Sequence, residues 1–358
     1  MPYPAPSATT PHAAELQRLY REIDALNLAP LWESLHDLVT PEPVTPVVPT
    51  LWDFDGCLRS HLLQAGKLIS AERAERRVLV LENPGLRGTT CATHSLYAGV
   101  QLVLPGEIAR THRHSQSAMR FVLESAGACT TVNGESIPMA PGDFVTTPAW
   151  TWHDHQNDTP EPAMWVDVLD VPIVSMLDGS FAQLGEAERQ VVTRAAGDGM
   201  AQFGHNMLPV DWVPHERFSP LFNYPYSKSR EALAALQRSG APDPYHGYKL
   251  RYVNPATGDF ALPTIGAFMQ LAPAGWSSQP YRCTDATIFV VVEGHGQTRV
   301  GSVVLQWKPR DIFIVPGWSR HTHHIVDEAV LFSASDRPVQ TKLGLWREER
   351  GEAGGSER

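Results

Sequence analysis

The sequence feature that most constrains the fold is the stretch 106–157, where four histidines fall in two pairs separated by strand-like runs and turns. One residue separates His112 from His114, so an extended strand projects both imidazoles from the same face. His153 and His155 repeat this alternation about forty residues later, beyond a turn-forming Met-Ala-Pro-Gly-Asp run. Two neighbouring antiparallel strands of this kind can bring three imidazoles to one point inside a barrel.

The composition is that of a globular protein with many turns. A chain of 358 residues exceeds the usual size of one domain, so more than one domain is expected. With 42% hydrophobic and 19% charged residues the chain can bury a substantial core. Thirty prolines and 27 glycines favour short strands over long helices.

Charge and cysteine usage limit the classes of binding partner and the cellular compartment that the sequence is compatible with. The formal net charge is −10 and no run of Lys and Arg occurs, which argues against a nucleic-acid partner. The N-terminus has no signal-like pattern and no long apolar run occurs, so we expect a cytoplasmic protein with no membrane partner. The four cysteines form no CxxC pair and are expected to be reduced thiols: Cys57, Cys91, Cys129 and Cys283.

Changes in residue composition and in the spacing of apolar residues divide the chain into five segments. Residues 1–50 should hold two helices, at about 11–26 and 30–38, followed by a proline-rich connector, with residues 1–10 poorly ordered. Residues 51–171 and 263–345 show the alternation of apolar runs and turns that is typical of β-barrels, with one short helix at 60–65 ending at Gly66. The inter-domain segment 172–262 shows helical patterns at 185–196 and 229–238, and the tail 346–358 is predicted to be flexible from Glu348 on.

The second β-rich block is a diverged copy of the first. A shift of about 168 residues places Pro148–His153 on Pro316–His321 and Gly106 near Gly275. In that register Tyr281 and Cys283 occupy the positions of His112 and His114. We therefore expect one competent metal site per chain, with His321, His323 and His324 as a remnant, although a Tyr/Cys/His metal site there stays conceivable.

These motifs resemble the cupin pattern. Gly106-x5-His112-x-His114 and Gly142-x5-Pro148-x-Trp150-x2-His153-x3-Asn157 match its two parts, with Trp150 in a position usually held by glycine. Two such blocks resemble a bicupin. The runs 74–79, 96–102, 112–118, 150–155 and 252–258 further resemble the gentisate 1,2-dioxygenase and salicylate 1,2-dioxygenase family, over nearly the whole chain.

The resemblance implies an all-β fold of two antiparallel β-barrels (double-stranded β-helix), with N-terminal helices and a partly helical inter-domain segment. It implies an Fe(II)-dependent dioxygenase in which His112, His114 and His153 bind the metal. Most metal-binding cupins add a glutamate where this chain has Ala118 and Met119. Three neutral ligands leave the metal its full charge, which favours a substrate that arrives as a dianionic chelate, such as an ortho-hydroxybenzoate.

By the same resemblance the substrate is gentisate, opened with O2 between the carboxyl-bearing and hydroxyl-bearing carbons to give maleylpyruvate. Salicylate, substituted salicylates and 1-hydroxy-2-naphthoate are the alternatives within the class. Relatives are homotetramers, and the N-terminal helices are suited to subunit contacts. A cupin isomerase or sugar-binding enzyme and a non-enzymatic storage or regulatory bicupin are the alternatives outside it.

The resemblance also assigns pocket roles. Arg120 lies six residues beyond His114, a spacing that the period of two places on the same strand face, and is expected to bind the substrate carboxylate. Arg76 is the second candidate cation, although the sequence leaves open whether Arg76 or the adjacent Arg77 turns inward. Tyr97, Gly99 and Gln101 match substrate-binding positions. His155, oriented by Asp167, is the candidate for a proton shuttle.

Overall fold

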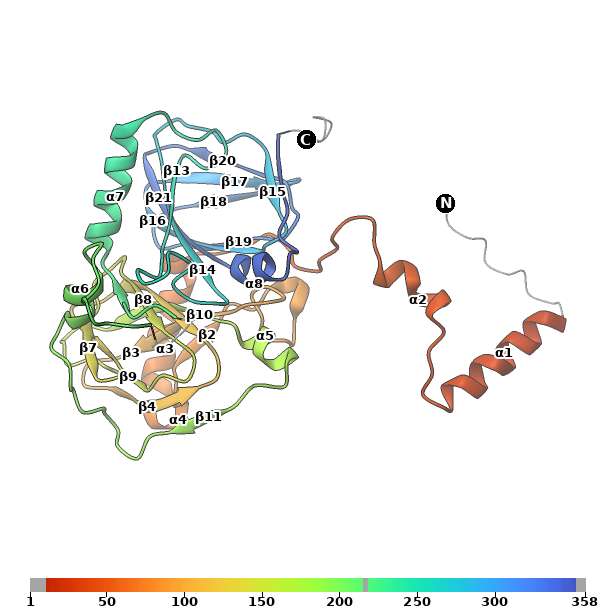
Figure 1. The fold of residues 1–358 in the computed structure, drawn as a ribbon, viewed down its shortest axis with the longest axis horizontal. Helices are drawn as coiled ribbons and strands as arrows, with labels where there is room; N and C mark the ends of the chain where they lie inside the picture. The colour runs from red at the N-terminus through yellow and green to blue at the C-terminus, as the bar shows by residue number, and fades with distance from the viewer. Residues whose placement is uncertain (1–10, 215–217, 352–358) are drawn as a thin grey trace. The chain divides into compact units, whose positions relative to one another are not determined.

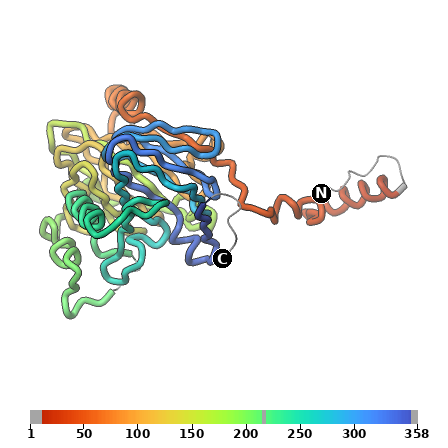
Figure 2. The backbone as a smooth tube through the Cα atoms, turned by 90° about the horizontal axis from the view of Figure 1, so that it is seen from above, coloured from red at the N-terminus to blue at the C-terminus, as the bar shows by residue number. Residues whose placement is uncertain are grey.

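The computed structural model describes residues 11–214 and 218–351, which divide into two units between Val44 and Thr45. The first unit holds α1 (Pro11–Asp24) and α2 (Leu31–Leu38), as predicted (Figure 1 and Figure 2). Within it the Trp32 indole donates a hydrogen bond to the Tyr20 hydroxyl at 3.0 Å. The expectation of poor order for residues 1–10 lies outside the described residues. None of the described helices is both long and apolar enough to cross a membrane.

The first barrel consists of two antiparallel sheets that face each other. The six-stranded sheet has the order β12 (Asn223–Tyr224), β8 (Phe144–Thr147), β5 (Ala118–Glu124), β10 (Ala163–Leu169), β3 (Tyr97–Val103), β2 (Val78–Val80). The five-stranded sheet has the order β11 (Ala182–Leu184), β4 (Ile108–His114), β9 (His153–Gln156), β6 (Cys129–Val132), β7 (Glu135–Pro138). The predicted histidine pairs therefore lie on neighbouring strands.

The second barrel repeats this arrangement. Its six-stranded sheet runs β1 (Thr50–Trp52), β19 (Ile312–Val315), β16 (Thr287–Glu293), β21 (Ala329–Ser335), β14 (Gly266–Ala272), β13 (Tyr248–Arg251). Its five-stranded sheet runs β18 (Val303–Trp307), β17 (Gly296–Val300), β20 (His321–Ile325), β15 (Tyr281–Cys283), β22 (Glu348–Arg350). The predicted architecture of two antiparallel barrels is confirmed. The prediction of a flexible tail from Glu348 on is wrong for β22, because this strand pairs with β15.

Two helix predictions in the remaining chain were also wrong. Helix α3 (Arg59–Leu68) continues through Gly66 instead of ending there. Residues 185–196 form no helix; they lie along the first barrel, where the Gly185 N–H donates to the Thr111 carbonyl at 2.8 Å and the Thr193 N–H to the Gly134 carbonyl at 3.0 Å. The other helices are α4 (Ala71–Ala74), α5 (Val171–Met176), α6 (Asp198–Phe203), α7 (Tyr226–Ser239) and α8 (Arg337–Lys342).

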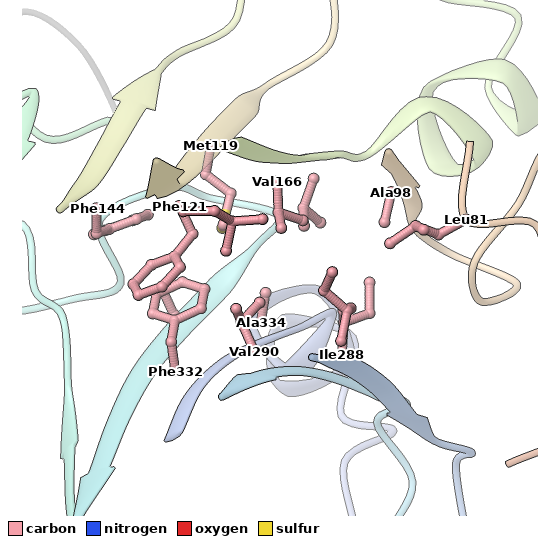
Figure 3. Close-up of a cluster of buried hydrophobic side chains, with 14 of the residues drawn as sticks. Leu81, Ala98, Met119, Phe121, Phe144, Val166, Ile288, Val290, Phe332 and Ala334 are labelled. Carbon is pink, nitrogen blue, oxygen red and sulfur yellow. The ribbon is translucent and has the colours of Figure 1, made fainter. Parts of the chain in front are cut away.

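The six-stranded sheets of the two barrels pack face to face and bury one continuous apolar core (Figure 3). Phe121 of β5 and Phe332 of β21 are stacked across this interface, with ring centroids 4.2 Å apart. Both rings are buried, so removing either one leaves a cavity between the barrels. The barrels therefore share one core and hold each other in place.

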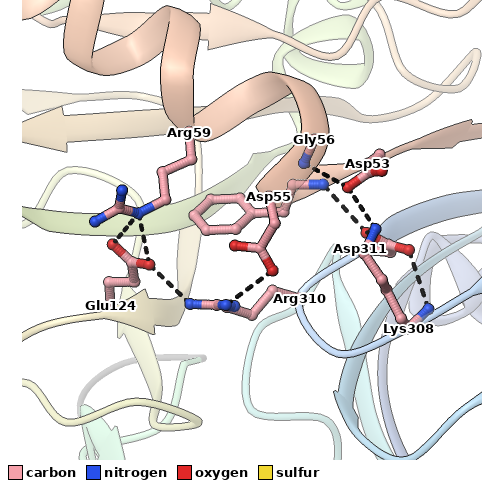
Figure 4. Close-up of polar contacts among 9 residues, drawn as sticks. Asp53, Asp55, Gly56, Arg59, Glu124, Lys308, Arg310 and Asp311 are labelled. Atoms are coloured by element: carbon pink, nitrogen blue, oxygen red, sulfur yellow. Dashed lines mark hydrogen bonds and ion pairs between the residues drawn. The ribbon is translucent and has the colours of Figure 1, made fainter.

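A polar network at one edge of this interface ties the chain before α3 to the second barrel (Figure 4). Arg310 donates to Glu124 and to Asp55, each at 2.8 Å, and Glu124 also accepts from Arg59. The Asp311 carboxylate accepts the backbone N–H of Phe54 at 3.1 Å. Strand β1 also pairs with β19, so an N-terminal segment forms part of the C-terminal barrel. The sequence did not predict this long-range pairing.

The predicted internal duplication extends to backbone conformation. Trp150 and Trp318, which stand at equivalent positions, both adopt left-handed conformations, with φ of 60° and 59°. The Trp150 N–H donates to the His114 carbonyl at 2.8 Å, and the Trp318 N–H to the Cys283 carbonyl at 2.5 Å. A residue other than glycine is strained there. An arginine stacked on each indole accompanies this conformation: Arg113 on Trp150 and Arg282 on Trp318.

Candidate metal centre

Three histidines of the first barrel meet at one point, as the spacing predicted. His112 on β4 pairs directly with His153 on β9, next to a register shift between Ala109 and His112 that re-aims the strand. One nitrogen from each of His112, His114 and His153 lies within 4.8 Å of the others. Among the described residues, no other set of His, Cys, Asp or Glu side chains meets this criterion.

The hydrogen bonds of the imidazoles suit a metal. The Nδ1 atoms of His114 and His153 lie 2.9 Å from the backbone carbonyls of Gln116 and Thr151. A proton on Nδ1 satisfies these carbonyls and leaves each Nε2 lone pair free to bind a metal ion. The His112 Nδ1 lies 3.2 Å from the Arg110 carbonyl but 2.6 Å from an Arg76 guanidinium nitrogen, which can only donate, so these contacts alone do not assign the tautomer of His112.

The site also favours the neutral form that a ligand histidine needs. Burial lowers the pKa of His112 to about 3 and that of His114 to about 4, and lowers the pKa of His153 well below its ordinary value. The neighbouring arginines add to the effect. All three imidazoles are therefore neutral at neutral pH, with one N–H each, so no imidazolium proton has to leave before a metal binds. The donor set fits a first-row divalent metal that accepts imidazole ligands.

The three histidines open into a cavity of ≈ 220 Å³ inside the first barrel. An apolar cavity of about 150 Å³ already admits benzene, so this space accepts one substituted aromatic ring. Its apolar wall was not predicted from the sequence, because isolated aliphatic residues on strands carry no functional signal. That wall consists of Val78, Ala118, Leu169 and Val171.

The structure decides which of the two adjacent arginines faces the cavity. Arg76 lines it, and a guanidinium nitrogen lies 2.6 Å from the His112 Nδ1 and 2.9 Å from the Arg110 carbonyl. Arg77 points to the other side, where it forms an ion pair with Glu107 at 2.7 Å and donates to the Ile69 carbonyl. Arg76 is therefore the cation available to a ligand, and Arg77 anchors the strand.

Arg120 and Asp167 form a buried ion pair at the cavity. The Arg120 Nε lies 3.3 Å from the Asp167 Oδ1, but neither atom has a hydrogen-bond partner among the described residues. Arg120 also donates to the Thr147 hydroxyl, and Asp167 accepts from the Trp165 indole at 3.0 Å. Burial raises the pKa of Asp167 to about 6, although Arg120 and the Trp165 hydrogen bond oppose the shift.

The prediction that Asp167 orients His155 is wrong, because the two side chains have other partners. The His155 Nδ1 is hydrogen-bonded to the Thr130 hydroxyl, and the ring lies edge-on to Trp165 with centroids 5.3 Å apart. Asp167 is bonded to Arg120 and Trp165 instead. His155 does line the cavity, and burial lowers its pKa well below the ordinary value. It therefore carries no charge at neutral pH.

Tyr97 and Gln101 line the cavity, as expected, and Gly99 acts through its neighbours. A Cβ at Gly99 would lie 2.5 Å from Val78 Cγ1 and 2.8 Å from the Tyr97 hydroxyl oxygen. A glycine is therefore needed for both side chains to keep their places. Burial first, and the charge of Asp167 second, raise the pKa of Tyr97 well above its ordinary value, so its hydroxyl stays a hydrogen-bond donor.

Fold and site together define a class: a bicupin with a three-histidine metal centre in its first barrel. The Cupin domain model matches residues 99–169. The chain is 52% identical over 336 residues to gentisate 1,2 dioxygenase 1 of Aquipseudomonas alcaligenes, covering 94% of this chain and 96% of that protein. The chain belongs to the gentisate 1,2-dioxygenase family.

Solved structures of related enzymes have the same fold over nearly the whole chain. Salicylate 1,2-dioxygenase of Pseudaminobacter salicylatoxidans is 32% identical, with a TM-score of 0.89 over 98% of this chain and 99% of that one. The structure of that enzyme with gentisate has a TM-score of 0.88 and 32% identity, and the match covers 99% of this chain and 96% of that chain.

Proposed function

We propose that the protein is an Fe(II)-dependent dioxygenase that opens the ring of gentisate between the carboxyl-bearing and hydroxyl-bearing carbons and produces maleylpyruvate. His112, His114 and His153 would hold the iron, which supplies the electron transfer that lets dioxygen react with the ring. The observation that carries the proposal is the meeting of this triad with two arginines in one cavity of aromatic size. The 52% identity to a gentisate 1,2-dioxygenase supports the substrate.

Binding and orientation fall to the side chains around the triad. Arg120 and Arg76 are suited to the substrate carboxylate, because a guanidinium in a water-poor cavity forms strong bonds to carboxylates. Asp167 would position Arg120 without touching the substrate. The Tyr97 hydroxyl, held as a donor by burial, is placed to hydrogen-bond a ring hydroxyl. The aliphatic wall would hold the ring and exclude water.

His155 remains a proposed proton carrier, with one revision to its partners. Its Nδ1 is engaged by Thr130, so only Nε2 is free to exchange a proton with the cavity. Thr130→Val would remove the hydrogen bond to the His155 ring while keeping the size and shape of the side chain at position 130. A proton-carrying role predicts a changed pH profile of kcat in that variant, whereas a purely structural role predicts lower stability with an unchanged profile.

Oxygen consumption by Fe(II)-loaded protein tests the activity directly. We expect uptake of one O2 per gentisate and loss of this uptake in Arg120→Met through a raised KM. The control variant Arg189→Met, whose guanidinium pairs with the exposed Asp158 outside the cavity, should retain full uptake. Absence of uptake with every ortho-hydroxybenzoate would falsify the dioxygenase proposal. A higher kcat/KM for salicylate or 1-hydroxy-2-naphthoate than for gentisate would keep the class and correct the substrate.

We also propose a cytoplasmic homotetramer in which the N-terminal helices contact other copies. Helix α2 buries none of its residues within the chain, and Trp32 and Leu38 are 62% and 68% exposed. Four free thiols agree with a reducing compartment. Light scattering of the full chain and of a chain beginning at residue 45 tests the assembly: the full chain should have four times the protomer mass and the shortened chain less. Equal masses would contradict the role of the helices.

A further inference from the structure

The second barrel lacks the metal triad but keeps an interior cavity, and its strand register allows a position-by-position comparison with the first. Val78 pairs with Gln101 between β2 and β3, and Lys249 pairs with Gln270 between β13 and β14. Lys249 thus occupies the position of Val78, while the glutamine is retained. By the same comparison of equivalent strands, Arg337 follows β21 as Val171 follows β10.

This exchange alters the cavity wall. In the first barrel both positions are aliphatic and line a cavity of ≈ 220 Å³, whereas in the second they are cationic and line a cavity of only ≈ 20 Å³. A space of that size holds only an ion or molecule of very few atoms, since roughly 10–15 Å³ is the minimum for one water molecule. An aromatic ring is therefore excluded from the second barrel, and only a very small occupant fits.

Neither cation at this cavity forms an ion pair among the described residues, although the Asp285 carboxylate acts on Lys249 from a longer distance. The Lys249 ammonium forms no hydrogen bond in the described part of the chain and lies 4.9 Å from the centroid of the Phe268 ring. The Arg337 guanidinium forms no ion pair and lies over Trp346 at 3.9 Å. Burial and, to a smaller extent, the charge of Arg337 lower the pKa of Lys249, and the opposing effects of Cys283 and Asp285 do not fully compensate for them.

The other polar groups at the cavity leave room for an anion. The Gln270 Nε2 is buried without a hydrogen-bond partner. Asp285, the one carboxylate that lines the cavity in the described part of the chain, accepts a hydrogen bond from the Trp346 indole at 2.8 Å and forms no ion pair with Lys249. Burial lowers the pKa of His321 to about 4 and that of His246 to about 2, so neither imidazole adds charge. The lining residues therefore carry one net positive charge.

We propose that the second barrel binds one small monovalent anion, of the size of a halide or formate, between Lys249 and Arg337, with the Gln270 amide as a further donor. The cations supply the attraction, the unpartnered amide supplies a directed N–H, and the cavity volume limits the size. The occupant would stabilise the second barrel. The site is separate from the metal centre and does not depend on the proposed reaction.

Thermal unfolding of the full chain at constant ionic strength tests the site. Replacing gluconate, which is too large for the cavity, by chloride, bromide or formate should raise Tm saturably, by about 2–6 °C. Lys249→Val, which installs the residue of the first barrel, should remove this dependence. Lys228→Ala, a change at a side chain that is 66% exposed, should leave it intact. A response to halides alone identifies a halide site, and a response to formate alone identifies a carboxylate site.

Bromide-soaked crystals of the unmodified protein provide a readout that does not depend on the variant folding. An anomalous peak between Lys249 and Arg337 is expected. The proposal is overturned by the absence of both the peak and any saturable rise in Tm, by a rise that persists in Lys249→Val, or by a rise with phosphate only, which is too large for the cavity.

Discussion

Asp167→Asn should make the protein more stable, although it removes one partner of a buried ion pair. The Arg120–Asp167 contact is long, at 3.3 Å, and its two facing atoms have no hydrogen-bond partner in the described part of the chain, so the attraction does not offset the desolvation of the carboxylate. This is why the pKa of Asp167 rises from 3.8 to about 6. Because about two pKa units correspond to roughly 3 kcal/mol, the charged carboxylate is less favourable in the folded than in the unfolded protein by up to that amount.

The pH dependence of the gain follows from the same shift. A carboxyl group whose folded pKa is raised binds its proton more tightly when folded, so it lowers stability as pH rises from about 4 to about 6. Asparagine mimics the protonated acid and keeps the Trp165 hydrogen bond. The gain should therefore be up to about 3 kcal/mol at pH 7.5 and disappear below about pH 3.5.

Urea unfolding of the metal-free variant and parent at pH 7.5, 5.5 and 3.5 measures this difference. Asp178→Asn, a change at an exposed position, controls for the loss of one negative charge. A variant that is less stable than the parent at pH 7.5 would refute the reasoning, since the ion pair would then outweigh burial. We expect the stability gain to be accompanied by a higher KM, because Asp167 no longer orients Arg120.

Three further outcomes follow from the structure. His112→Ala should abolish metal binding, whereas His321→Ala should leave the metal content of the purified protein unchanged; elemental analysis decides this. Phe332→Ala should lower the free energy of unfolding by about 3–5 kcal/mol in urea titrations, because it removes the ring stacked on Phe121 at the core between the barrels. Gly99→Ala should change the ratio of kcat/KM for gentisate and salicylate, because the added methyl displaces the Tyr97 hydroxyl; an unchanged ratio would count against a role for this contact.

The metal triad was predictable from sequence because strand geometry alone determines it. Alternation places His112 and His114 on one face, and antiparallel pairing brings His153 opposite. The duplication and the missing second site could also be read from residue spacing. The two barrels and the helices α1, α2 and α7 followed from hydrophobic periodicity and turn residues.

The remaining features depend on tertiary contacts that a local pattern does not encode. Adjacent Arg76 and Arg77 point to opposite sides of the same segment, and only packing decides which faces the cavity. Residues 185–196 have a helical pattern, but their backbone forms hydrogen bonds with the first barrel instead of within a helix. The pairing of β1 with the C-terminal barrel spans more than two hundred and fifty residues of sequence, as Thr50 opposite Ile314 illustrates, and has no local signal.

The two barrels serve as an internal control for the roles of individual residues. The hydrogen bond between Thr130 and His155 recurs between Thr298 and His323, at 2.8 Å, in the barrel that has no metal triad. A contact kept where the chemistry is absent is best explained by the barrel itself, so the Thr130 contact gives no support of its own to the proton transfer proposed for His155. Positions that differ between the barrels carry the functional divergence. Among the first-barrel residues at such positions are Val78, His112, His114, Arg120, Asp167 and Val171.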